Sequence, residues 1–146
     1  MKTEIITKSF KSSIPENSLA DINSLLKQLS KSAKKLWPQD LHRKLRQQDV
    51  EICVVFHKKH IVGMGSIYFK ETLIRKTGVI EDVVVDENHR GKGLGKRIVQ
   101  ALIDEAKRRK AYCIDLISES GRIPARAMYE KAGFRKRYGY YRLILK

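Results

Sequence analysis

A strand, a glycine-rich basic loop and a helix follow one another without interruption between residues 79 and 109, and this unit limits the fold more than any other part of the chain. The strand is almost entirely valine and isoleucine, which is typical of a strand buried on both faces, although Glu81 and Asp82 interrupt it. From Gly95 onward, apolar residues recur at helical spacing, which predicts a helix with one buried face. The rest of the chain alternates between strand and helix patterns, so the sequence predicts an α/β fold.

The loop between this strand and helix has the composition of a phosphate-binding site. Glycines let backbone N–H groups approach a ligand closely, and the first turn of the helix adds unpaired N–H donors at the positive end of its dipole. Arg90, Lys92, Lys96 and Arg97 add full positive charges. The spacing of the P-loop is absent, and Lys96 stands where the dinucleotide fingerprint requires a third glycine. The loop therefore predicts a phosphorylated ligand that is bound in neither of these two ways.

Two segments of the chain carry a resemblance to a known family. The Arg-x-x-Gly-x-Gly spacing of Arg90, Gly93 and Gly95 resembles the loop with which the GNAT superfamily of N-acetyltransferases binds the pyrophosphate of coenzyme A. The segment AMYEKAGF at residues 127–134 resembles a late segment of the same family. The two segments occur in the family's order, about a helix and a strand apart. Taken alone, the loop would also suit an ordinary glycine-rich turn on a basic surface.

The resemblance implies one acetyltransferase-like domain over residues 1–146. Its expected fold is a mixed, mostly antiparallel sheet of about seven strands, flanked by helices and splayed between strands four and five. The hydrophobic patterns predict strands at residues 4–10, 51–56, 61–70, 79–85, 111–117, 134–138 and 140–145, and helices at residues 15–29, 41–48, 95–109 and 124–132.

The resemblance also implies that acetyl-coenzyme A binds as co-substrate. Its pantetheine arm would lie in the splay between the strands at residues 83–85 and 113–117, held by backbone groups of Val83 and Val85, and the loop would hold the pyrophosphate. Arg126 stands where many relatives carry an asparagine, and it would contact a coenzyme phosphate instead. The residues expected to bind the coenzyme are Val83, Val84, Val85, Arg90, Gly91, Lys92, Gly93, Leu94, Gly95, Lys96 and Arg126.

Acetyl transfer to an amine needs a base for the amine and an acid for the departing thiolate. Glu81 is the first candidate for the base, because burial in a valine strand raises the pKa of a carboxyl group, and Asp82 is the second. Strand alternation puts these two side chains on opposite faces. Either acid would equally suit a structural pair with an arginine, and water is a third route for the proton. Tyr129 matches the family tyrosine that protonates the thiolate, while packing on the sheet is its structural alternative.

The sequence therefore predicts an N-acetyltransferase that uses direct attack in a ternary complex, with a small-molecule or peptide amine as acceptor. The stretch at residues 81–95 also resembles glucosamine-6-phosphate N-acetyltransferases, but the fifth predicted strand lacks their Asp-Cys and following Asn, so that acceptor is not adopted. Leu29, Trp37 and Leu41 are candidates for the acceptor side, with simple packing as the alternative for Trp37. The other class of function is a catalytically idle domain that binds coenzyme A, or uses its basic surface, to regulate a partner.

Charge and composition limit the remaining classes. The chain has 31 basic and 16 acidic residues, a net charge of +15 that would attract polyanions. These charges are spread along the chain without interleaved aromatic residues, so nonspecific polyanion binding is expected rather than a nucleic-acid module. The four histidines have no metal-ligand spacing, and no metal is expected.

The apolar segments predict a cytoplasmic protein. None approaches the roughly 20 residues of a membrane helix, and the first residues lack the apolar run of a signal peptide. Cys53 and Cys113 both lie in apolar strand patterns and are interpreted as reduced, buried side chains. The oligomeric state, a homodimer included, is left open by the sequence.

Overall fold

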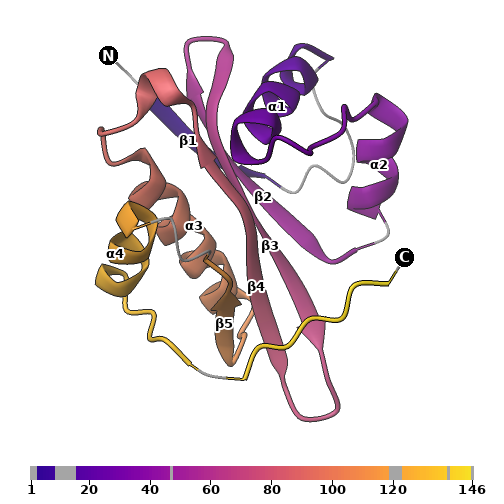
Figure 1. The fold of residues 1–146 in the computed structure, drawn as a ribbon, viewed down its shortest axis with the longest axis vertical. Coiled ribbons are helices and arrows are strands. Elements are labelled where there is room, and N and C mark those ends of the chain that lie inside the picture. The colour runs from indigo at the N-terminus through magenta and orange to yellow at the C-terminus, as the bar shows by residue number, and fades with distance from the viewer. Residues whose placement is uncertain (1–2, 9–15, 47, 119–122, 138, 146) are drawn as a thin grey trace.

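The computed structural model describes residues 3–8, 16–46, 48–118, 123–137 and 139–145. The elements are, in chain order, β1 (Thr3–Lys8), α1 (Glu16–Leu29), α2 (Pro38–Arg46), β2 (Val50–His57), β3 (His60–Glu71), β4 (Lys76–Val85), the short 3-10 helix η1 (Glu87–His89), α3 (Leu94–Arg108), β5 (Cys113–Leu116) and α4 (Ile123–Lys131) (Figure 1). Each helix predicted from the sequence is therefore present, and the predicted strands up to residue 117 correspond to β1–β5.

The described strands form one mixed sheet between two layers of helices. The five strands lie in sequence order, β1-β2-β3-β4-β5. Neighbouring strands from β1 to β4 are antiparallel, whereas β5 is parallel to β4 after a crossover through α3. Figure 1 shows α1 and α2 on one face of the sheet and α3 and α4 on the other. This arrangement agrees with the α/β class predicted from the sequence.

The core is divided by the sheet into two apolar clusters, because successive strand residues point to opposite faces. In β2, Val54 belongs to the cluster under α1 and α2, while its neighbours Cys53 and Val55 belong to the cluster under α3. All three side chains are fully buried. The helix α3 comes very close to the sheet, since a Cβ built on Gly65 would lie 2.8 Å from Ile98 Cγ2. A glycine in the middle of β3 is therefore required by packing.

The predicted sheet of about seven strands is wrong, because the described residues form five. The last two predicted strands, at 134–138 and 140–145, have no regular secondary structure in residues 134–137 and 139–145. A β-prone segment becomes a strand only where it finds a backbone partner and an apolar face to cover. Here Tyr141, Leu143 and Leu145 stay exposed, with 93%, 84% and 86% of their surface accessible, so the segment gains neither.

The C-terminal end of α3 is held by a cluster of charges around Arg109. The guanidinium group of Arg109 bonds Asp49 and Glu51 and donates to Glu105 at 3.0 Å. It also lies 4.5 Å from the centre of the Phe69 ring. Glu51 is buried, with 6% of its surface exposed, so this arginine neutralises a carboxylate within the sheet layer. The cluster therefore ties the C-terminal end of α3 to β2.

Candidate functional site

A pocket of about 530 Å³ opens beside the second half of β4. β5 pairs only with residues 77–80 of β4, so among the described residues no strand pairs with the following part of β4 on that side. The pocket is lined by Leu29, Ile80, Glu81, Asp82, Val83, Val84, Val85, Arg90, Gly91, Gly93, Leu94, Gly95, Lys96, Leu116, Ile117, Ser118, Pro124, Ala125, Met128 and Tyr129. Its volume is within the range of small-molecule sites.

The glycine-rich loop forms one end of this pocket. Gly91 and Gly93 have φ angles of 76° and 75°, a left-handed conformation that glycine adopts readily. A Cβ built on either residue would meet nothing within 4 Å, so the space above both is open. Gly93 is the N-cap of α3 and offers no side-chain acceptor to the first N–H groups of the helix. Free backbone donors at a helix N-terminus are suited to an anion.

The third glycine of the loop has a different role. A Cβ built on Gly95 would lie 3.2 Å from Met128 Sδ of α4. The absence of a side chain at Gly95 therefore allows α4 to pack against the first turn of α3. This contact brings the helix that carries Tyr129 to the pocket.

The turn between β4 and the loop is fixed by Asp86 and Gln28. Asp86 accepts hydrogen bonds from Gln28 Nε2 at 2.8 Å, from the backbone N–H of Asn88 at 3.2 Å and from His89 Nδ1 at 2.9 Å. The bond from Gln28, followed by that from His89, lowers the pKa of Asp86. Arg90 Nε donates to the carbonyl of Val85 at 3.0 Å and links the loop to the strand end. Sequence reasoning missed Gln28, whose partner lies 58 positions away in the chain.

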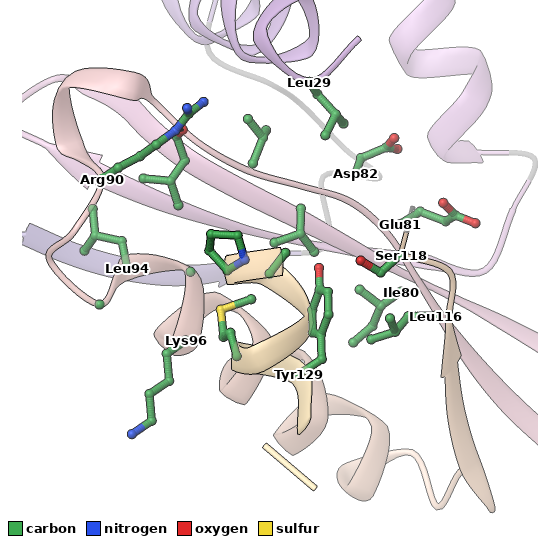
Figure 2. Close-up of a pocket in the computed structure, with 18 of the residues that line it drawn as sticks. Leu29, Ile80, Glu81, Asp82, Arg90, Leu94, Lys96, Leu116, Ser118 and Tyr129 are labelled. Atoms are coloured by element: carbon green, nitrogen blue, oxygen red, sulfur yellow. The ribbon is translucent and has the colours of Figure 1, made fainter. Parts of the chain in front are cut away.

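A bulge in β4 changes the direction of the two predicted bases. Met64 stands opposite Val84 and Ser66 opposite Glu81, so two residues of β4 face the single residue between Met64 and Ser66. Asp82 is the extra residue of the bulge, and its backbone is in a left-handed conformation with φ of 55°. Strand alternation is interrupted here, and the prediction that Glu81 and Asp82 lie on opposite faces is wrong. Figure 2 shows both side chains on the side of β4 that faces α1 and α2.

The two carboxylates are exposed at the mouth of the pocket but are partly desolvated. Desolvation raises the pKa of Glu81, the charge of Asp82 raises it further, and Arg142 opposes both. Desolvation likewise raises the pKa of Asp82, against the effect of Lys44. Both negative charges add to the burial that raises the pKa of Tyr68, which packs on the same face. The charges of both carboxylates therefore reach the same residue, Tyr68, on this face of the sheet.

Tyr129 lines the opposite wall of the pocket from α4, and its hydroxyl end points toward β4 in Figure 2. Its ring packs edge-on against Phe134, with 6.0 Å between the ring centres and an angle of 70° between the planes. The backbone N–H of Phe134 also donates to the Tyr129 carbonyl at 3.1 Å. The MYEKAGF segment thus contains both Tyr129 and the residue that packs against its ring, Phe134.

The pocket brings together most of the residues predicted from the sequence. Glu81, Asp82, Tyr129 and the predicted coenzyme residues line it, apart from Lys92 and Arg126. Of the candidates for the acceptor side, Leu29 lines the pocket, Leu41 is buried in the core, and Trp37 is 54% exposed beside Lys35. The lining residues that sequence reasoning missed are Ile80, Ser118, Pro124, Ala125 and Met128, whereas Leu116 and Ile117 belong to the predicted strand that borders the splay. Their sequence patterns indicate only strand, loop and helix.

The described residues lack the features of a metal site and of a membrane span. Within those ranges, no group of three or more histidine, cysteine or acidic side chains is arranged to hold a metal ion. None of the helices described here has the length and apolar character needed to cross a membrane.

Comparison with known proteins gives consistent matches. The model of the acetyltransferase (GNAT) family matches residues 19–134. A glucosamine 6-phosphate N-acetyltransferase of Arabidopsis thaliana is 37% identical over 90 residues, which is 58% of either chain. The protein of that name from Trypanosoma brucei brucei is 38% identical over 88 residues, again 58% of either chain. The matched segment thus spans less than two thirds of the length of these curated relatives.

Solved structures match over the whole chain. An acetyltransferase of Trypanosoma brucei superimposes with a TM-score of 0.81 and 28% identity, covering 99% of this chain and 100% of that one. The glucosamine-6-phosphate N-acetyltransferase of Arabidopsis thaliana gives a TM-score of 0.80 and 25% identity, with both chains fully covered.

Proposed function

Because the chain belongs to the acetyltransferase (GNAT) family, we propose that it is an N-acetyltransferase that transfers the acetyl group of acetyl-coenzyme A to a primary amine. The observation that carries this proposal is one pocket with an anion-binding loop at one end and the carboxylates and tyrosine at the other. The reaction needs both ends, since the phosphates position the thioester and the polar side chains move protons.

The loop end suits the pyrophosphate of acetyl-coenzyme A. Gly91 and Gly93 leave open space where a side chain would stand, and the first N–H groups of α3 face it. Arg90 adds a positive charge at the same end of the pocket. The pantetheine arm would follow residues 83–85, which line the pocket between the two ends. Lys92 and Arg126 remain predicted coenzyme contacts outside the lining.

The transfer proceeds by direct attack of the amine in a ternary complex. The amine nitrogen attacks the thioester carbonyl carbon, the new C–N bond forms, and the C–S bond breaks. Glu81 takes the proton of the amine, and the raised pKa of this carboxyl group suits a base. Asp82 is the second candidate for this role and water the third. The phenol of Tyr129 protonates the departing thiolate.

The test is acetyl transfer by the purified chain. Incubation with acetyl-coenzyme A and an amine library should release free thiol and yield acetylated amine, detected by a thiol reagent and by mass spectrometry. Coenzyme binding without thiol release from any amine would instead support the idle regulatory domain.

Glucosamine 6-phosphate is the second candidate acceptor, on the strength of the relatives that carry this name at 37% and 38% identity. The library therefore contains glucosamine both with and without its phosphate. A phosphorylated acceptor needs cations at the acceptor end, and glucosamine 6-phosphate would then react faster than glucosamine.

A further inference from the structure

The acceptor end of the pocket contains two carboxylates that form no direct ion pair with a described side chain, although Arg142 and Lys44 act on them at longer range. Within the described ranges, no hydrogen bond or ion pair includes the carboxylate of Glu81 or of Asp82, although both line the pocket. The buried and half-buried acids of the described residues are all bonded: Glu51 and Glu105 to Arg109, Asp86 to its three donors, Asp21 to the backbone N–H of Ile61, and Asp40 to the backbone N–H of Trp37. In a chain with a net charge of +15, two neighbouring acids without a bonded cation differ from the other acids just described.

A second observation at this end also points to a ligand. The Oγ atom of Ser118 is buried without any hydrogen-bond partner, and Ser118 lines the same pocket. In Figure 2, Ser118 and Glu81 both lie at the end of the pocket away from Arg90 and Lys96. Buried polar atoms in proteins are almost always bonded, so an unpartnered oxygen on a residue that lines the pocket points to a polar group of a ligand. A hydroxyl and two carboxylates together offer acceptors to an ammonium group.

The walls and charges of the pocket define the rest of this ligand. Leu29, Leu116 and Ile117 give the acceptor end an apolar wall. The basic lining residues, Arg90 and Lys96, lie at the loop end in Figure 2. The nearest cations to the carboxylates, Lys44 and Arg142, are exposed side chains outside the lining. The pocket is therefore positive where the coenzyme phosphates would bind and negative at the opposite end.

Resting on the acetyl transfer proposed above, we infer that the acceptor is an aliphatic amine with a second positive charge, of the diamine class. One amino group reacts beside Glu81 and Tyr129, the methylene chain lies on the apolar wall, and Asp82 binds the second ammonium group. Asp82 is then a specificity residue that exists on this face because the bulge turns it there. This assignment also disfavours an acceptor that carries a phosphate.

The experiment compares matched acceptors at saturating acetyl-coenzyme A. Pentylamine and 1,5-diaminopentane have the same chain and differ only in the second charge. We expect kcat/KM to be about tenfold higher for the diamine, after division by two for its two equivalent amines, as roughly one charge pair about 6 Å apart in a partly solvated site would give. Glucosamine should likewise react faster than glucosamine 6-phosphate. Both preferences should shrink in about 0.5 M salt.

Variants at Asp82 test whether this residue causes the preference for the diamine over pentylamine. Asp82→Gly suits the bulge, because glycine readily adopts a positive φ, and Asp82→Asn keeps the size of the side chain. In both, the ratio of diamine to pentylamine should fall to about one, mainly through a higher KM for the diamine. Asp104→Asn, on the exposed surface of α3, removes the same charge and should leave the ratio unchanged.

Five outcomes would overturn the inference, and they separate it from the proposed function. Turnover without a diamine preference, or with a preference that both Asp82 variants retain, removes the selection by charge and leaves acetyl transfer intact. Faster reaction of glucosamine 6-phosphate than of glucosamine means that the acceptor end binds an anion. An equal loss of rate with both amines in the Asp82 variants makes this residue the base. Coenzyme binding without turnover of any amine removes the function and the inference together.

Discussion

Replacement of Arg109 by methionine should destabilise the fold by about 3 kcal/mol, although the residue lies far from the pocket. The guanidinium group bonds Asp49, Glu51 and Glu105, and its loss leaves the buried Glu51 without its partner. Removal of one partner of a buried ion pair costs about 3–5 kcal/mol. We take the lower value because Asp49 is 46% exposed and can be solvated. In a domain of this size, such a loss lowers Tm by roughly 10 °C.

The assay is thermal unfolding followed by circular dichroism, with Arg108→Met as the matched control. Arg108 also bonds Glu105, but 68% of its side chain is exposed, so its replacement should lower Tm only slightly. A double variant, Arg109→Met with Glu51→Leu, removes the unpaired charge and should recover most of the loss. Equal Tm values for the Arg108 and Arg109 variants would refute the reasoning.

The pH dependence gives an independent check on the same cluster. The bond from Arg108 lowers the pKa of Glu105 most, burial opposes it, and the bond from Arg109 lowers it further. A carboxyl group whose pKa is lowered by folding stabilises the fold above its unfolded pKa, here 4.5, and this stabilisation is lost as the pH falls through its folded pKa. The difference in Tm between the wild type and Arg109→Met should therefore be largest near pH 7 and shrink below about pH 4.5. A constant difference down to pH 3 would contradict an electrostatic origin.

Three further predictions concern the pocket and the surface. Tyr129→Phe should lower kcat by roughly 10²–10⁴-fold and leave the affinity for acetyl-coenzyme A within a few fold, because it removes the proton-donating hydroxyl and keeps the ring; undiminished activity with chemistry rate-limiting would exclude the general acid. Acetyl-coenzyme A at about 100 times its Kd should raise Tm by roughly 5–10 °C, and Gly93→Asp should abolish most of this shift. Gly133→Asp, at another left-handed glycine outside the pocket lining, should keep the shift, and a shift retained in the Gly93 variant would rule out the loop site. DNA binding, measured by fluorescence anisotropy, should be weak and should collapse between about 50 and 200 mM salt; tight, sequence-selective binding would favour a nucleic-acid function.

The predictable parts of the fold are those in which the residue types of a segment, taken alone, show which of its faces is buried. The apolar periodicity of α3 and the valines of β4 mark a buried face directly, and the strand and helix positions follow from them. The family predicted from Arg90, Gly93, Gly95 and the segment at 127–134 is confirmed. Such patterns are local, so a single sequence contains them.

The parts that were not predictable depend on a partner elsewhere in the chain. Tyr141 and Leu143 have the composition of a strand, but only the sheet decides whether an edge is available to them. The left-handed conformation of Asp82 follows from its register with β3, which strand alternation within β4 cannot reveal. Arg109 has the sequence of a helix end, and its role depends on Glu51, 58 positions earlier.

The contact between Gly95 and Met128 limits how this site can change during evolution. Gly95 belongs to the loop that would bind the coenzyme, whereas Met128 precedes the tyrosine that would donate the proton. A side chain at position 95 requires the Met128 side chain to shift by a few tenths of an ångström, or α4 to move away from α3. A lineage that altered one of these positions alone would disturb the placement of the acid without touching a ligand contact. Binding and proton transfer are thus inherited together, as a single sterically matched pair.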